Sequence, residues 1–110
     1  MATPRGNLLQ GTLHFLILKT LTWGPRHGYA IARWLEDTTD DTLQIEEGSL
    51  YPALYRMEKR GWIAAEAGIS DLGRRVKVYA LTPRGRDQLR AEESRWAAFS
   101  AAVSKVLQPA

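Results

Sequence analysis

One short stretch of the chain, residues 49–60, gathers aromatic, hydroxyl and basic side chains. Leu50, Leu54 and Met57 recur at i, i+4 and i+7, which predicts a helix with one apolar face. The opposite face then carries groups that suit phosphate oxygens and base edges. Six residues supply these groups: Ser49, Tyr51, Pro52, Tyr55, Arg56 and Lys59. Packing tyrosines and solvated charges are the alternative, and for Tyr51 alone both interpretations stay open, whereas the group together favours nucleic acid.

A second basic cluster consists of Arg74, Arg75 and Lys77. It falls in and just after residues 68–75, a glycine-containing segment between two strand-like segments, which predicts a β-hairpin with cations at its tip. Guanidinium groups on a narrow ribbon can enter a minor groove or hold its phosphates. A loop that is basic only for solubility is the alternative.

Other kinds of chemistry find little support in the residue types. The chain has no cysteine, which excludes disulfides, thiolate metal sites and cysteine nucleophiles. His14 and His27 lack carboxylates at metal-ligand spacing, so we expect no metal and no cofactor, and we expect His27 to cap or touch the start of the second helix. Ser49 has no base in a recognisable motif, and no glycine-rich phosphate loop is present. We therefore expect no catalytic residues and no enzymatic activity.

Three short helices are expected to position the first cluster. Apolar residues at helical spacing over 13–21 predict the first helix, and residues 29–37 predict the second. Residues 43–45 alternate in the manner of a very short strand. The third helix is the one described above, with Ser49 as its N-cap and Pro52 in its first turn, where a missing N–H costs least.

The hairpin strands are predicted over residues 62–67 and 76–81, and one long helix follows, with Thr82 as its N-cap. Its apolar seam is close to a heptad pattern and is longer than so small a domain can cover. We expect the seam to pair two copies of the chain. The residues expected at this dimer contact are Leu13, Leu16 and Ile17 of the first helix and Leu89, Trp96, Phe99, Val103 and Val106 of the last.

Length and charge fit one small domain with a polyanionic partner. The chain has 110 residues and a net charge of +3, with acids gathered over residues 36–47 and cations over residues 56–90. No apolar stretch is long enough to span a bilayer, and residues 1–6 lack a signal-peptide pattern. We expect a cytoplasmic protein with no membrane partner.

The order helix, helix, helix, hairpin, helix predicts an α+β fold, the winged helix-turn-helix, in which the third helix holds the recognition position. We expect residues 1–82 to form this DNA-binding domain. Residues 83–110 are expected to form a dimerisation helix that packs with the domain and is not independent of it.

Five segments resemble the PadR family of bacterial transcriptional regulators: residues 11–13, 16–18, 24–31 (GPRHGYAI), 48–54 (GSLYPAL) and 79–85 (YALTPRG). The resemblance covers nearly the whole chain, and the single C-terminal helix is similar to the short branch of the family. It implies a homodimeric repressor with two winged heads joined through their C-terminal helices, which typically pack on the partner's first helix. Two such heads should read an inverted-repeat operator in double-stranded DNA.

The resemblance also implies roles for individual residues. Tyr29, Ser49, Tyr51, Pro52 and Tyr55 match family positions at or near DNA, and Arg74 with Arg75 matches the basic wing. Some short members stack flat ligands on a tryptophan of the C-terminal helix, which makes Trp96 and Phe99 candidates for a small aromatic effector. A dimer-core tryptophan without a ligand is the alternative for Trp96. The alternative for the whole chain is a protein-interaction module that binds DNA only nonspecifically.

Overall fold

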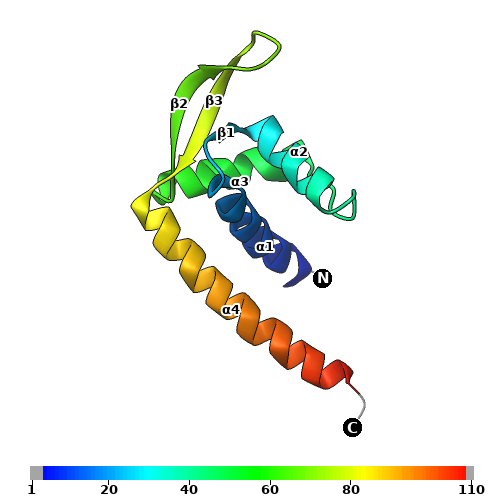
Figure 1. Cartoon of the computed structure of the whole chain (residues 1–110). Coiled ribbons are helices and arrows are strands. Elements are labelled where there is room, and N and C mark those ends of the chain that lie inside the picture. The colour runs from blue at the N-terminus through cyan, green and yellow to red at the C-terminus, as the bar shows by residue number, and fades with distance from the viewer. Residues whose placement is uncertain (1–3, 109–110) are drawn as a thin grey trace.

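The computed structural model describes the backbone of residues 4–108, and the side chains from residue 11 onward, as helices around a small antiparallel sheet (Figure 1). The outermost residues of the two predicted parts, 1–82 and 83–110, lie outside this range. The elements are α1 (Pro4–Leu21), β1 (Arg26–His27), α2 (Gly28–Thr38), α3 (Glu47–Lys59), β2 (Ile63–Ile69), β3 (Arg75–Leu81) and α4 (Pro83–Leu107). The predicted winged helix-turn-helix with a long C-terminal helix is confirmed.

The first three helices share one apolar core beneath the sheet. Ile17 and Leu18 of α1, Ile31 of α2 and Leu54 of α3 have no exposed surface, and each such burial contributes about 1.5–3 kcal/mol. This burial corrects part of the predicted dimer contact. Ile17 is wholly buried and Leu89 is 6% exposed within their own chain, so neither offers a surface to a partner.

The start of α3 differs from the prediction. The helix begins at Glu47, because the carbonyl of Glu46 accepts the first bonds, from the N–H groups of Ser49 and Leu50 at 3.0 and 2.9 Å. Glu46 is therefore the N-cap residue, without a side-chain bond, and Ser49 lies inside the first turn. Pro52 consequently falls in the helix interior and not in the first turn.

The short strand predicted at residues 43–45 is wrong. The backbone N–H of Ile45 donates to the Glu36 carboxylate at 2.9 Å, and that of Leu43 donates to the Thr39 hydroxyl at 3.2 Å, so these groups bond to side chains and form no strand ladder. The third strand is β1, which pairs with β3 through Arg26↔Tyr79 and His27↔Val78.

The hairpin, hereafter the wing, is longer than predicted. Its strands pair out to Ile69↔Arg75, so the loop is only residues 70–74 and Gly68 belongs to β2 and not to the tip. A Cβ on Gly68 would lie 2.5 Å from Cγ2 of Val78, which explains the glycine at this position. The wing and α4 leave the helical body in opposite directions (Figure 1), and the chain measures 56 Å along its longest axis.

A tight junction joins the wing to α4. As predicted, Thr82 caps α4, because its hydroxyl accepts from the Gly85 N–H at 3.0 Å. The same hydroxyl donates to the Gly61 carbonyl at 2.6 Å, and the Thr82 N–H donates to the Trp62 carbonyl at 3.1 Å. A Cβ on Gly85 would lie 2.0 Å from the Trp62 carbonyl oxygen, so only glycine allows this approach.

Replacing Gly85 by alanine should therefore destabilise the fold. The added methyl meets backbone that cannot move aside, and we expect the free energy of unfolding to fall by about 2–3 kcal/mol. Gly11→Ala is the control, because Gly11 has open space around it and alanine favours a helix by about 0.5–1 kcal/mol. Urea denaturation of both variants checks this, and an unchanged midpoint for Gly85→Ala would contradict it.

Candidate nucleic-acid interface

Five of the six residues predicted on α3 have exposed side chains: Ser49, Tyr51, Pro52, Tyr55 and Lys59. Tyr55 is 62% exposed, and the Lys59 ammonium lies 5.4 Å from the centre of its ring, in the range of a cation–π contact. An aromatic ring and a cation are thus presented together on the exposed face of α3, free of the core.

Tyr51 lies on the flank of α3 that faces α2 and the wing. A Cβ on Gly28, the buried first residue of α2, would lie 2.7 Å from Cε1 of the Tyr51 ring, so the tyrosine packs directly on this glycine. Burial raises the pKa of the Tyr51 phenol, and the Glu47 carboxylate raises it further. Tyr51 therefore stays a neutral hydroxyl that can donate to an anion.

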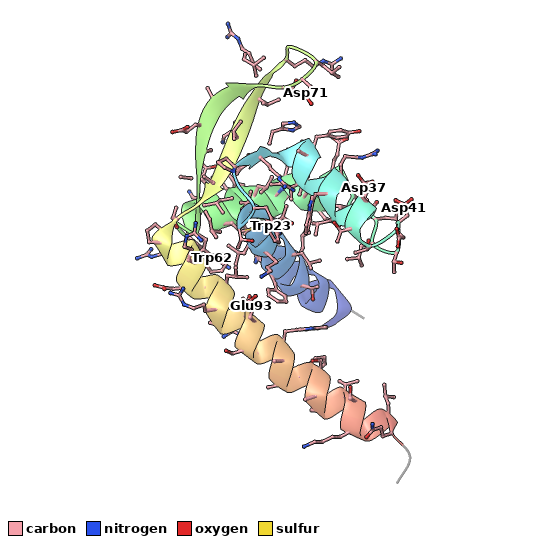
Figure 2. The ribbon with its side chains drawn as sticks, viewed as in Figure 1. Trp23, Asp37, Asp41, Trp62, Asp71 and Glu93 are labelled. Atoms are coloured by element: carbon pink, nitrogen blue, oxygen red, sulfur yellow. The ribbon has the colours of Figure 1, made fainter. Side chains whose placement is uncertain are left out.

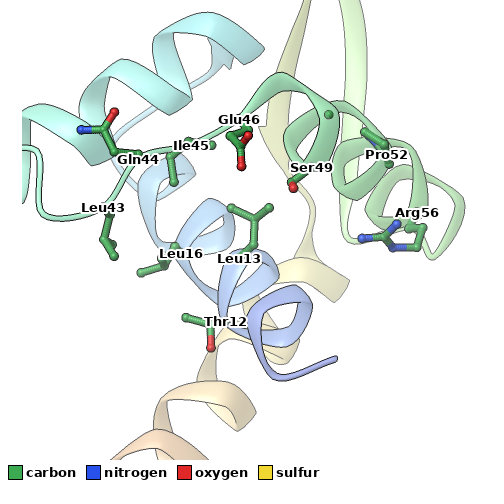
Figure 3. A pocket seen from close by; sticks show the side chains of 11 residues that line it. Thr12, Leu13, Leu16, Leu43, Gln44, Ile45, Glu46, Ser49, Pro52 and Arg56 are labelled. Carbon is green, nitrogen blue, oxygen red and sulfur yellow. The ribbon is translucent and has the colours of Figure 1, made fainter. Parts of the chain in front are cut away.

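Arg56 lies on the opposite flank, toward α1. Its Nη2 is 3.4 Å from Nε2 of His14, and it borders a groove of about 400 Å³ between α1, the α2–α3 loop and α3 (Figure 3). Leu13 and Leu16 form the α1 wall of this groove. Ser49 and Pro52, two further predicted contact residues, line the same groove, so these three side chains lie on the flank toward α1 and not in the wing groove.

The wing completes a second groove, of about 730 Å³, between β3, the start of α2 and α3. Arg74, Arg75 and Lys77 line it together with Tyr29 and Tyr51, so the structure brings five of the predicted residues to one place. The Lys77 ammonium is 3.2 Å from the Glu58 carboxylate of α3, which ties the wing to that helix. Figure 2 shows Asp71 at the far tip of the wing and Asp37 and Asp41 at the end of α2.

The groove also contains residues that the sequence did not identify as part of the site. His27 caps α2 as expected, accepting from the Ala30 N–H at 3.3 Å through Nδ1, and its ring is stacked on that of Tyr29 at 6.4 Å. Tyr79 of β3 lines the groove floor, although it is only 5% exposed. Burial raises the pKa of its phenol, against the opposing effect of Lys77. The pairing of β1 with β3 brings these residues together, and no local pattern predicts that pairing.

The comparison with protein families decides the identity. The model of the "Transcriptional regulator PadR-like family" matches residues 17–91. The chain belongs to the PadR-like family of transcriptional regulators. Members of this family are DNA-binding regulators and not enzymes, so the predicted family and the predicted absence of enzymatic activity are confirmed.

Several relatives support the assignment of this PadR-like chain. An uncharacterised protein of Lysinibacillus sphaericus is 34% identical over 94 residues, covering 84% of this chain and 85% of its own. A solved transcriptional regulator from Clostridium thermocellum superposes with a TM-score of 0.84 at 27% identity, over 93% of this chain and 99% of the other. A PadR-like transcriptional regulator from Bacillus cereus gives a TM-score of 0.79 at 31% identity, over 94% and 99%.

The long α4 of this PadR-like protein leaves much of its apolar seam exposed. Trp96 is 51% exposed, with its ring 6.4 Å from Phe15 of α1 and 6.1 Å from Phe99, and these rings border a shallow cleft of about 230 Å³. Val103 and Val106 are also exposed. That Trp96 and Phe99 receive an aromatic effector stays a prediction. Within residues 4–108, no helix has the length and apolarity needed to cross a membrane.

The buried imidazole of His14 gives this PadR-like regulator a testable pH dependence. Burial lowers the pKa of His14, and the guanidinium groups of Arg56 and Arg60 lower it further, whereas the Glu92 carboxylate raises it. Near the ordinary histidine pKa of about 6.5, the unfolded chain therefore binds a proton that the folded chain does not. The stability that neutral His14 contributes is complete above that pH and is lost as the pH falls below it.

We expect the free energy of unfolding to fall between about pH 7.5 and pH 5.5, with this group contributing at most about 1.4 kcal/mol per pH unit. His14→Gln should flatten this slope, whereas His27→Asn, which retains His14 and a capping acceptor, should keep it. Urea denaturation across this range is the measurement. A His14→Gln profile parallel to that of the parent would disprove the assignment.

Proposed function

We propose that this PadR-like protein is a dimeric repressor that binds an inverted-repeat operator in double-stranded DNA. The observation that carries the proposal is the juxtaposition of the exposed face of α3 with the wing groove, which unites Tyr29, Tyr51, Arg74 and Arg75. A recognition helix beside a basic ribbon matches the size and charge of adjacent grooves in a duplex. Its place of action is the cytoplasm, where bacterial DNA lies.

In this proposal, the two elements have different tasks. Pro52, Tyr55 and Lys59 of α3 enter the major groove and contact base edges, since they are exposed and lie away from the core. Arg74 and Arg75 neutralise phosphates, because neither takes part in an ion pair among residues 11–108. Tyr29, Ser49 and Tyr51 contribute hydroxyl groups toward the DNA backbone. Lys77 contributes charge in addition to its bond with Glu58.

We propose that the dimer forms through contacts between α4 of one copy and α1 of its partner. In this proposal, residues 1–82 form the DNA-binding head and residues 83–110 form the dimerisation helix. Phe99, Val106 and Leu107 are 56%, 82% and 76% exposed in one copy, and an isolated helix end of this kind is only marginally stable in water. Leu13 and Leu16, which border the groove beside α1, are the counterpart that a second copy offers (Figure 3).

The division of tasks on the DNA makes different variants fail in different ways. Arg75→Ala should weaken binding to the operator and to random duplex by similar factors, and it should lower the salt slope by about one phosphate contact per head. Tyr55→Ala should weaken operator binding by about 1–3 kcal/mol and random binding far less. Affinities for both duplexes across a salt series are the measurement.

The matched control is Arg90→Ala, which removes one guanidinium from α4, where it pairs with Asp87 away from the wing. It should leave both affinities unchanged. A protein-interaction module would instead bind every duplex with the same nonspecific affinity, and Tyr55→Ala would not change that affinity. These two results together would refute the proposed function.

The dimer is tested by a charge at the exposed end of the seam. Val106→Asp should convert the dimer to a folded monomer, because Val106 contributes nothing to the core of its own head and burying an unpaired carboxylate is costly. Ala101→Asp places the same charge on the other side of α4 and should leave the dimer intact. Sedimentation equilibrium distinguishes them; a Val106→Asp protein that remains dimeric would exclude this interface.

A further inference from the structure

The free end of the wing carries a large apolar side chain where a basic loop would need none. Leu72 lies in the turn between β2 and β3 and is 81% exposed. Leaving such a side chain in water forgoes about 1.5–3 kcal/mol of burial. The turn of residues 70–74 that carries Leu72 forms the free end of the wing, away from the helical body (Figure 1); its neighbour Asp71 is labelled in Figure 2.

The turn that presents Leu72 is held in one shape by hydrogen bonds. The Ser70 N–H donates to the Arg74 carbonyl at 2.8 Å, and the Gly73 N–H donates to the Ser70 carbonyl at 2.9 Å. The Ser70 hydroxyl accepts from the Arg74 N–H at 3.2 Å, and Gly73 takes the left-handed conformation with φ of 76°. Leu72 is therefore presented at a defined place, so little further ordering is needed on binding.

The charges around the tip of the wing favour contact with an anionic surface. Arg74 and Arg75 are exposed and follow Leu72 closely, and the turn has a single carboxylate, Asp71, against these two guanidinium groups. The exposed leucine also lines the groove that the wing shares with Tyr29 and Tyr51. It thus continues the surface that the proposed function assigns to DNA.

An apolar side chain flanked by guanidinium groups has a specific use in DNA binding. Apolar wedges inserted from the minor groove partly unstack a base step and kink the duplex, while arginines hold the narrow groove or its phosphates. We propose that Leu72 is such a wedge, entering the minor groove beside the half-site that α3 reads. This inference rests on the proposed function and adds to it a DNA deformation. Pyrimidine–purine steps, which unstack most easily, should be preferred at the wedge position.

The test uses the full-length protein and a duplex selected from a random-sequence pool by the parent. Leu72→Ser should bind this duplex about tenfold more weakly, or about 1.4 kcal/mol, and should bend it less. Its salt slope should be unchanged because no charge is lost. Bending is measured by energy transfer between the duplex ends, and unstacking by the fluorescence of 2-aminopurine at the step facing the wing.

Two further variants isolate the wedge from a general loss of apolar surface. Leu72→Met keeps an apolar side chain at the tip and should retain affinity, bend and 2-aminopurine signal. Ile69→Ser removes another exposed apolar side chain, 68% exposed in β2 and paired with Arg75, and should reduce the bend little. Equal loss of bending in Ile69→Ser and Leu72→Ser would overturn the assignment of Leu72.

The outcomes also separate this inference from the function on which it rests. If the parent enriches no duplex, the proposed function and the wedge both fall. If the parent binds its duplex and Leu72→Ser leaves the bend and the 2-aminopurine signal unchanged, only the wedge is refuted.

Discussion

Thr82 lies where the wing ends and α4 begins, and it is hydrogen-bonded both to the segment before β2 and to the first turn of α4. Its hydroxyl donates to Gly61 and accepts from Gly85, while its backbone N–H bonds to Trp62. Gly85 packs against the Trp62 carbonyl more closely than any side chain would allow. These contacts hold the first turn of α4 against the backbone at Gly61 and Trp62, and so orient α4 relative to the head. In the proposed dimer, that orientation sets how far apart the two recognition helices lie, and hence the spacing of half-sites.

The recognition helix is held from two flanks by contacts of different strength. On the wing side, Tyr51 lies against Gly28, and the Glu58–Lys77 ion pair adds little, because such exposed pairs contribute about 0–1 kcal/mol. On the α1 side, Arg56 is next to the buried His14. Steric contact with Gly28 thus determines the position of Tyr51, while the exposed ion pair contributes little.

The first helix serves two surfaces at once. One side supplies Ile17 and Leu18 to the core, and the other leaves Leu13 and Leu16 along an open groove. Lys19 near its end meets the Glu93 carboxylate of α4 at 3.2 Å, and Phe15 faces Trp96. A change in the packing of α1 would therefore reach both the recognition helix and the long α4, which would give the aromatic effector predicted at Trp96 a physical path toward the proposed DNA-binding face.

Local patterns in the sequence determined most of the elements. Leu50, Leu54 and Met57 define the inner face of α3, and Thr82 followed by proline marks the start of α4; both are confirmed, because a helical period and an N-cap act within one or two turns of chain. The two glycines and the aspartate of residues 68–75 likewise predicted a hairpin, though its strands extend further.

Only the tertiary structure decided which surfaces these elements present. In the sequence, Ile17 and Leu89 look like the apolar residues that stay exposed on α4. They are nevertheless buried, because helices distant in sequence pack against them. Likewise, the helical period places Arg56 on one side of α3 with Ser49 and Pro52, but only the packing of α1 brings that side against His14. The two-residue β1 exists only because β3 lies beside it. A periodic pattern predicts which side of a helix or strand is apolar. It does not predict which element packs against that side, because this depends on how segments far apart in the chain are arranged in space.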